Sequence, residues 1–363
     1  MTPAIHALFD KLLAQQGSDL HLAPGYPPML RVRGDLVPAP GEPVLEAASV
    51  QRLLEELLSP QQRAQVEATG DLDFAYAYAS KARFRGNIMR KLSGLGGVFR
   101  TIPSKILSLE QLGVPVGIRR LAELRSGLVL VTGPTGSGKS TTLAAMIDHL
   151  NGTRRGHILT IEDPVEFVHT SRSCLVTHKE VGDHVPSFLE AIRSAGRENA
   201  DVILVGELRG AETMKLALQL ASFGILIFAT VHTNSAAATI DRFVNAFPAD
   251  QQPQIRGLLA DSLAGVVAQQ LLKRADGSGR VAAHEILVGN LALASLIREG
   301  KTSQIASFIQ SGQAEGMQTM DSALDRLVRE GAVRATDALE KAIDKESFSK
   351  LPHITRELAG EPV

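Results

Sequence analysis

One octapeptide constrains the fold of this chain more than any other segment. Residues 133–140 read Gly-Pro-Thr-Gly-Ser-Gly-Lys-Ser, a complete match to the phosphate-binding pattern G-x-x-x-x-G-K-[ST]. Residues 128–132 before it form a continuous apolar run, as in a buried parallel strand, and residues 141–150 after it have a helical pattern that Asn151-Gly152 is expected to end. A strand, a glycine-rich turn and a helix N-terminus surround a phosphate with backbone N–H groups. The chain is therefore expected to bind a nucleoside triphosphate.

The residue types in this segment predict individual roles. Lys139 is expected to contact the β- and γ-phosphates of ATP, and the Ser140 hydroxyl is expected to bind Mg²⁺. A chance glycine-rich loop is a poor alternative, because both flanks fit the strand and helix that the motif requires. The predicted nucleotide-binding residues are Gly133, Pro134, Thr135, Gly136, Ser137, Gly138, Lys139, Ser140 and Thr141.

Composition narrows the classes of function. A chain of 363 residues exceeds a comfortable single core, so two domains are expected, and 44% hydrophobic residues fit globular folding. A net charge of −1 gives no general attraction to nucleic acid, and no nucleic-acid partner is expected. The single cysteine, Cys174, excludes an intrachain disulfide and a zinc cluster of thiolates.

The apolar stretch 216–231 is too short and too polar for a membrane span, and is interpreted as a helix end followed by a strand.

The hydrophobic patterns predict three regions. Residues 1–102 combine amphipathic helices with short alternating strands and predict a small α+β domain, and residues 103–117 have the proline and glycine content of a linker. Residues 118–363 alternate apolar strands with helical patterns and predict a parallel sheet built from βαβ units. Its strands are expected at 128–132, 157–161, 202–205 and 225–230, and its later helices at 258–272, 292–297, 305–309 and 320–328.

Acidic residues follow two of these strands. Glu207 comes after strand 202–205, where a P-loop NTPase holds water on Mg²⁺ or polarises the attacking water, so Glu207 joins Ser140 as a predicted metal site. Glu162, Asp163 and Glu166 come after strand 157–161, and carboxylates this close repel one another unless a cation neutralises them. In isolation they would form a solvated acidic turn. Beside a magnesium nucleotide a catalytic role is favoured.

A histidine and two arginines complete the candidates from the residues alone. His232 ends the strand that includes residues 228–231, and it could hydrogen-bond to the γ-phosphate or to Glu207, or be only a turn residue. Arg83 and Arg85 lie on one face of a predicted strand. Exposed arginines are commonly solvated, but a guanidinium also stabilises phosphate oxygens bound at an interface.

Together these segments resemble the secretion ATPases of the type IV pilus and type II secretion superfamily, and among them the pilus retraction ATPases. Extension and secretion members usually carry a four-cysteine zinc element, and the single cysteine of this chain favours the retraction branch. The matching segments run nearly end to end. Residues 17–22 with 27–31 resemble the opening of the N-terminal domain. Four later segments resemble the nucleotide motifs: the Walker A motif at 133–140, the aspartate box at 162–167, the Walker B motif at 205–207 and the histidine box at 232–236. Residues 296–301 with 316–321 resemble the C-terminal signatures of the retraction branch.

The resemblance implies a fold and a function. It implies a PAS-like N-terminal domain followed by a RecA-like P-loop NTPase domain, assembled as a hexameric ring that hydrolyses ATP to power pilus retraction and twitching motility. ATP with Mg²⁺ would bind between the domains, where Glu166 and Glu207 would handle water and metal. Arginines of the N-terminal domain would reach the phosphates, and the candidates are Arg83, Arg85 and Arg90.

The same resemblance implies partners and a location. The chain is expected to assemble with further copies of itself, and to act on a platform protein of the inner membrane. A paralogous retraction ATPase is a further candidate partner. The expected location is the cytoplasm, at the inner face of the cytoplasmic membrane, with attachment through the partner because no membrane-spanning segment is predicted.

Three positions depart from the family pattern and keep an alternative open. Asn199, Gly210 and Ile225 stand where retraction members typically have Asp, Asp and His. The alternative is an accessory ring subunit that binds ATP, turns it over poorly and supports a partner motor. A related secretion ATPase is disfavoured by the missing zinc cysteines, and a small-molecule P-loop kinase would not need the arginine-bearing N-terminal domain.

Overall fold

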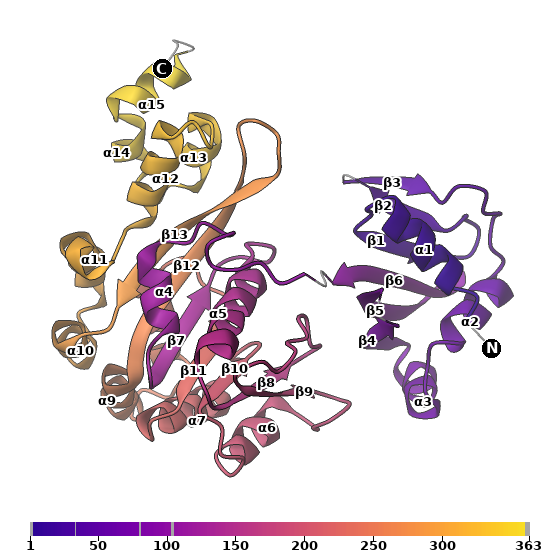
Figure 1. Cartoon of the computed structure of the whole chain (residues 1–363), viewed down its shortest axis with the longest axis horizontal. Coiled ribbons are helices and arrows are strands. Elements are labelled where there is room, and N and C mark those ends of the chain that lie inside the picture. The colour runs from indigo at the N-terminus through magenta and orange to yellow at the C-terminus, as the bar shows by residue number, and fades with distance from the viewer. Residues whose placement is uncertain (1–2, 33, 80, 103–104, 360–363) are drawn as a thin grey trace. The chain divides into compact units, whose positions relative to one another are not determined.

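The computed structural model describes residues 3–32, 34–79, 81–102 and 105–359, which form two compact units (Figure 1). The first unit comprises residues 1–105 and 164–168, and the second comprises 106–163 and 169–363. Pro103 and Ser104, at the start of the predicted linker, lie outside the described residues. Leu109, further along that segment, is buried in the core of the second unit.

The first unit is built on a six-stranded sheet in the order β3-β2-β1-β6-β5-β4, in which every neighbouring pair is antiparallel. Helices cover one face of this sheet, as its alternating burial requires. The elements are α1 (His6–Ala14), β1 (Asp19–Leu22), β2 (Met29–Val32), β3 (Asp35–Pro38), α2 (Ala47–Glu55), α3 (Pro60–Thr69), β4 (Asp71–Tyr78), β5 (Ala82–Lys91) and β6 (Gly94–Ile102).

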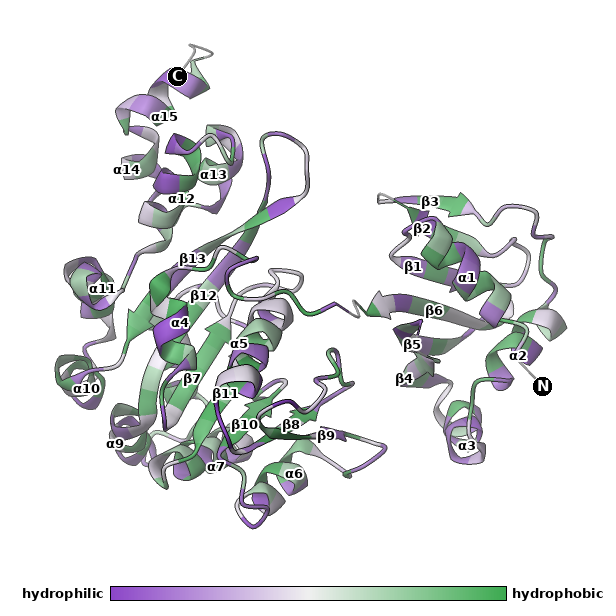
Figure 2. Ribbon diagram, in the orientation of Figure 1, coloured by the Kyte–Doolittle hydropathy of each residue, from purple (hydrophilic) through white to green (hydrophobic). Residues whose placement is uncertain are grey.

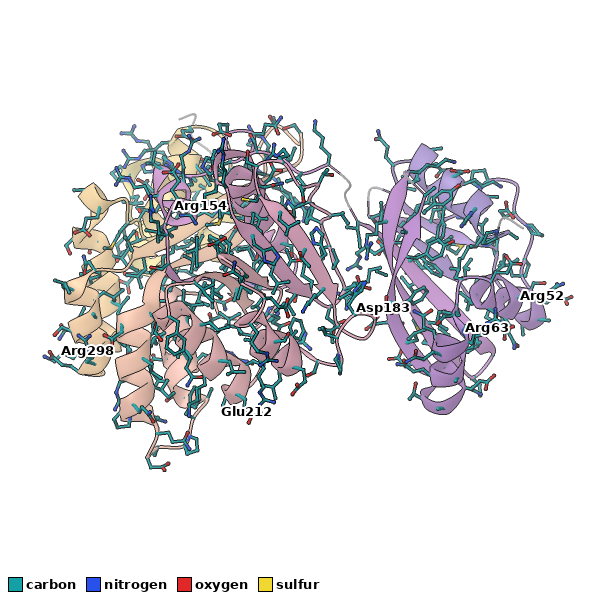
Figure 3. The ribbon with its side chains drawn as sticks, turned by 60° about the horizontal axis from the view of Figure 1, so that its bottom comes forward. Arg52, Arg63, Arg154, Asp183, Glu212 and Arg298 are labelled. Carbon is teal, nitrogen blue, oxygen red and sulfur yellow. The ribbon has the colours of Figure 1, made fainter. Side chains whose placement is uncertain are left out.

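Aromatic packing forms the core of the first unit. Phe9 of α1 stacks on Phe84 of β5 with ring centroids 4.1 Å apart, and both side chains are fully buried. Gly86 lies beneath this layer, where a Cβ would come within 2.8 Å of the Phe74 ring. The polar sides of the helices face outward, and Arg52 of α2 and Arg63 of α3 are exposed (Figure 3).

The second unit is built on a seven-stranded sheet in the order β13-β12-β7-β11-β10-β8-β9. All neighbours are parallel except β12 and β13, which pair antiparallel. The central strands are continuously apolar because helices cover both faces, and they are green in Figure 2. The strands are β7 (Gly127–Thr132), β8 (His157–Glu162), β9 (Leu175–Glu180), β10 (Val202–Val205), β11 (Leu226–Val231), β12 (Leu263–Lys273) and β13 (Arg280–Val288).

Two layers of helices enclose this sheet. Helices α4 and α5 pack on one face, and α6 to α9 pack on the other with α10 and α11 beside them. This arrangement confirms the predicted α/β fold with a smaller α+β unit before it. The helices are α4 (Val116–Ala122), α5 (Lys139–Thr153), α6 (Phe188–Ala195), α7 (Ala211–Ser222), α8 (Ala236–Asn245), α9 (Gln252–Ser262), α10 (Leu291–Arg298) and α11 (Ile305–Ser311).

The C-terminal helices form a further small cluster at one end of the β12–β13 hairpin (Figure 1). Leu324 of α12 is fully buried there, together with Leu272 of β12 and Ala283 of β13. The cluster therefore packs on β12 and β13, at one side of the sheet, and not on the central strands. Its helices are α12 (Met320–Arg329), α13 (Ala335–Lys341), α14 (Lys345–Ser349) and α15 (Pro352–Leu358).

Two predicted element boundaries are wrong. The helix expected over 258–272 is the end of α9 followed by β12, because the β-branched pair Val266 and Val267 is buried on both faces of a sheet. Helix α5 does not end at Asn151-Gly152 but continues to Thr153. The Asn151 side chain holds a neighbouring loop instead, donating to the carbonyl of Thr170 and accepting from the N–H of Arg172.

The apolar stretch 216–231 divides into the end of α7 and strand β11, as predicted. Among the residues that the structure describes, no helix is both long and apolar enough to cross a membrane.

Candidate nucleotide-binding site

The glycine-rich turn joins β7 to α5 at the carboxyl edge of the sheet. Gly136 and Gly138 have φ values of +79° and +88°, a left-handed conformation that glycine adopts without a Cβ penalty. Lys139 is the first residue of α5, so the N–H groups of Lys139, Ser140 and Thr141 belong to the first helical turn and have no acceptor within the helix. This geometry fits an anion at the helix N-terminus.

Lys139 is held inside the turn. Its side chain is buried, and its Nζ donates to the carbonyl oxygens of Gly133 at 2.9 Å and Pro134 at 3.0 Å. The ammonium therefore lies within the loop that would surround a phosphate. Triphosphate oxygens carry the negative charge that favours a buried ammonium.

The carboxyl ends of four parallel strands bring the predicted residues to one edge. In the order β7-β11-β10-β8, these ends lead to the glycine-rich turn, His232, Glu207 and Glu162 respectively. The pairs Thr132 with Val231, and Val205 with Ile161, fix the register of this edge. Open α/β sheets bind their ligands at such an edge.

Backbone and hydroxyl contacts fix the turn that carries Glu207. The N–H of Gly206 donates to the carbonyl of Ile161 at 2.8 Å, and the N–H of Leu208 donates to the carbonyl of Thr230 at 3.0 Å. The Thr230 hydroxyl donates to the carbonyl of Gly206. Glu207 is therefore anchored to the strands on both sides of β10.

Glu207 is an ionised carboxylate at this edge. Burial raises the pKa of its carboxyl, but the hydrogen bond and charge of Arg209 and the charge of His232 outweigh that effect, so the pKa lies below its usual range. Arg209 Nη2 is 2.6 Å from Glu207 Oε2, and His232 Nε2 is 3.4 Å from Glu207 Oε1. The Arg209 side chain is 75% exposed, so this ion pair is accessible to a ligand.

Threonine hydroxyls connect the residues that follow His232 to β7, the strand that precedes the P-loop (residues 133–140). Thr132, the last residue of β7, contacts Thr233 through three hydrogen bonds of 2.6 to 2.9 Å. The Thr233 hydroxyl is also 2.6 Å from that of Thr239 on α8. Because Thr132 directly precedes Gly133, the first residue of the P-loop and the residue after His232 are held together.

Oxygen donors at this edge fit Mg²⁺. Ser140 presents a half-buried hydroxyl in the first turn of α5, and Glu207 presents an ionised carboxylate. The described residues contain no group of three or more His, Cys, Asp or Glu side chains that would hold a metal alone. Mg²⁺ is commonly bound by one or two protein oxygens together with substrate phosphates, so these residues fit a metal that arrives with a nucleotide.

The remaining candidates fall in different places. Glu162 is buried at the end of β8, in the second unit. Glu166 lies in the segment 164–168 that groups with the first unit, as do the arginines of β5. Arg83 and Arg85 share the open face of the first sheet, where Arg85 lies 3.8 Å from Asp73, whereas Arg90 is an odd number of residues away and lies on the opposite face.

Sequence reasoning missed two groups of residues at this site. The first is the contact between Thr132 and Thr233. Thr233 lies in the segment 232–236 that resembles the histidine box, but nothing in the sequence pairs it with Thr132. The second is Gln269 of β12, whose amide contacts the P-loop directly. The segment that contains Gln269 was predicted to be helical, so its contact with the loop could not be anticipated.

Comparison with known proteins identifies the class. Residues 69–348 match the family model described as "Type II/IV secretion system protein". The chain belongs to this family. The predicted nucleotide binding and the predicted enzyme class, a P-loop ATP hydrolase of the secretion type, are thereby confirmed.

Particular relatives lie within the pilus branch. The chain is 51% identical over 336 residues to the type IV pilus retraction ATPase PilT of Pseudomonas aeruginosa, covering 92% of this chain and 97% of PilT. It is 37% identical to the type IV pilus ATPase PilU of the same organism, covering 92% and 88%. A crystal structure of the pilus retraction motor PilT with bound ADP matches with a TM-score of 0.89 and 38% identity, covering 96% of this chain and 99% of that one. The predicted relationship to pilus retraction ATPases is confirmed.

Proposed function

We propose that this chain is the motor subunit of a hexameric ring that hydrolyses ATP to power retraction of a type IV pilus. The observation that carries the proposal is the meeting of the P-loop, the ionised Glu207 and His232 at one sheet edge. The high identity to a pilus retraction ATPase over nearly the whole chain supports the choice of machine.

In the proposed reaction the residues of the second unit have separate roles in binding phosphates, orienting water and sensing the γ-phosphate. The N–H groups of the turn and the Lys139 ammonium bind and orient the phosphates. Glu207 orients the attacking water, because an ionised carboxylate accepts hydrogen bonds from it and favours in-line attack on the γ-phosphate. His232 contacts the same carboxylate and reports the state of the γ-phosphate through it.

Mg²⁺ would be held by Ser140 and, directly or through water, by Glu207. When bound it neutralises charge that develops on the phosphate oxygens. Glu162, at the end of β8, is proposed to contribute to the same edge of the second sheet. Glu166, in the segment 164–168 that groups with the first unit, is also proposed to act on water or metal.

Arginines of the first unit are proposed to stabilise the transferred phosphoryl group. Arg83 and Arg85 have the placement expected of such residues, because they lie on the sheet face that the helices leave open. A guanidinium is always charged and matches phosphate oxygens, as this role requires. Arg90 lies on the opposite face, and its placement supports the role less.

The partners and the location are proposed from the family resemblance. We place the ring in the cytoplasm, at the inner face of the cytoplasmic membrane, where it acts on an inner-membrane platform protein of the pilus. A paralogous ATPase is a further proposed partner, since relatives named PilT and PilU occur in one organism.

One observation favours the accessory subunit as a second candidate. Gly210 replaces the acidic residue typical after Arg209, and Arg209 is paired with Glu207 at 2.6 Å. In an accessory subunit this ion pair would persist when nucleotide binds, and would keep Glu207 from water.

Complementation tests the proposed function. The gene is expressed in a Pseudomonas aeruginosa strain that lacks PilT, with Lys139→Ala as the matched control. We expect restored twitching motility with the wild-type chain and none with the variant. If a well-expressed wild-type chain restored motility only when PilU or another ATPase was also present, the accessory subunit would be favoured.

A further inference from the structure

Gln269 is a buried polar side chain beside the P-loop. It lies on β12, one residue beyond Ala268, which pairs with Thr132 at the end of β7. Its side chain is directed at the P-loop, and the residue is 2% exposed. A buried amide needs partners for both its N–H₂ and its carbonyl, so its hydrogen bonds identify what it holds.

One end of the Gln269 amide is hydrogen-bonded to the P-loop and the other end to α5, the helix that follows it. Its Nε2 donates to the carbonyl oxygen of Ser137 at 2.6 Å, and its Oε1 accepts from the Thr142 hydroxyl at 2.8 Å. A carbonyl oxygen can only accept, so the bond to Ser137 fixes which end of the amide points to the loop. Thr142 on α5 then holds the amide in that orientation.

Two glycines of the P-loop, Gly133 and Gly138, lie very close to Gln269. A Cβ at Gly133 would lie 2.3 Å from the main-chain carbonyl oxygen of Gln269, and a Cβ at Gly138 would lie 2.8 Å from its side-chain Nε2. Both ends of the turn therefore pack directly against Gln269. A side chain at either glycine would collide with Gln269.

The bond to Ser137 determines where an adjacent N–H points. A trans peptide group is planar, and its C=O and N–H point in opposite directions. When the Ser137 carbonyl points to Gln269, the N–H of Gly138 points away from β12. We propose that Gln269 is a positioning residue for the nucleotide: it holds the Ser137–Gly138 peptide so that the Gly138 N–H is presented to the phosphates.

The chain offers a matched control for this proposal. Gln270 is the next residue of the same strand, points to the other face and is only half-buried. Methionine has nearly the volume of glutamine but lacks the amide, so Gln269→Met removes both hydrogen bonds without adding charge. Gln270→Met makes the same chemical change away from the P-loop.

The test measures nucleotide affinity separately from folding. We would titrate the full-length proteins with a fluorescent ADP analogue and measure their melting temperatures without nucleotide. We expect Gln269→Met to weaken binding about tenfold, because the Gly138 N–H would lose its well-placed hydrogen bond to the phosphates. We expect Gln270→Met to leave the affinity unchanged. Unchanged affinity in Gln269→Met, with or without a lower melting temperature, would overturn the proposal, because that is the result for a residue that only packs.

A second variant keeps the test decisive if Gln269→Met folds poorly. Thr142→Val removes the hydroxyl that orients the amide but leaves the loop itself intact. We expect a smaller loss of affinity, about threefold. In the double variant the effects should not add, since both changes remove one network. Full additivity of the two losses, or no loss in Thr142→Val, would contradict the proposed role.

Discussion

Nε2 of His232 lies 3.4 Å from Oε1 of Glu207, and this contact joins the carboxyl ends of two neighbouring parallel strands. Strand β11, which carries His232, is also the neighbour of the P-loop strand β7. The histidine is therefore placed between the phosphate-binding loop and the proposed water-orienting carboxylate. Its side chain is 42% exposed, so a bound nucleotide could reach it.

Replacing this histidine should impair turnover more than binding. We expect His232→Ala to lower kcat for ATP about tenfold or more while the Kd for ADP changes by less than about threefold, because the contact with Glu207 matters most when charge develops on the γ-phosphate. Steady-state hydrolysis and nucleotide titration measure the two quantities. His149→Ala is the control, since His149 makes a similar contact with Glu123, 3.2 Å away, near the C-terminal end of α5. Equal losses in both variants would contradict a special role for His232.

Arginines on the two faces of β5 test the proposal that arginines of the first unit stabilise the transferred phosphoryl group. Arg85→Ala should reduce kcat about a hundredfold and leave nucleotide affinity nearly unchanged, since a charge-stabilising arginine acts mainly on the transition state. Arg90→Ala removes the same type of side chain from the opposite face of the strand and should have little effect on either quantity. If Arg90→Ala proved the more damaging variant for kcat, the assignment of the open face would be wrong.

A buried histidine should make the second unit sensitive to acid. Burial and the nearby charge of Arg326 lower the pKa of His284 to about 4, against 6.5 for the exposed side chain. Between these values the unfolded chain binds a proton that the folded chain does not, so stability falls as the pH decreases from 6.5 towards 4. The slope is at most about 1.4 kcal/mol per pH unit for one such group.

The variant His284→Leu removes this effect. We expect its melting temperature to fall less than that of the wild-type chain between neutral pH and about pH 5. His184→Leu, at an exposed histidine, should keep the wild-type acid sensitivity. An unaltered acid response in His284→Leu would show that other groups carry the pH dependence.

The sequence predicts that the P-loop, Glu207 and His232 lie at one edge of the sheet, and the strand order shows this arrangement. The P-loop, Glu207 and His232 each follow an apolar strand, and parallel strands end at a common edge, so the sequence pattern alone implies that they meet. The strands β7, β8, β10 and β11 were predicted because a strand buried on both faces is continuously apolar.

The rest could not be predicted for physical reasons. Strand β12 follows α9 without a break, and its apolar run contains no period that separates a buried strand from a buried helix. Gln269 reaches the P-loop from 132 residues further along the chain than Ser137, a contact that depends wholly on sheet order. The face of Arg90, by contrast, could have been predicted, because Arg90 is an odd number of residues from Arg83 and Arg85 on one strand.

Steady-state ATP hydrolysis by the purified chain tests the central claim most directly. It should be measured beside Lys139→Ala, which removes the ammonium proposed to bind the phosphates, and Glu207→Gln, which keeps the shape of the carboxylate but not its charge. An autonomous motor predicts clear turnover by the wild-type chain that both variants lose, with ADP still bound by Glu207→Gln. Wild-type turnover no greater than that of the variants, with nucleotide still bound, would contradict the motor and identify an accessory subunit.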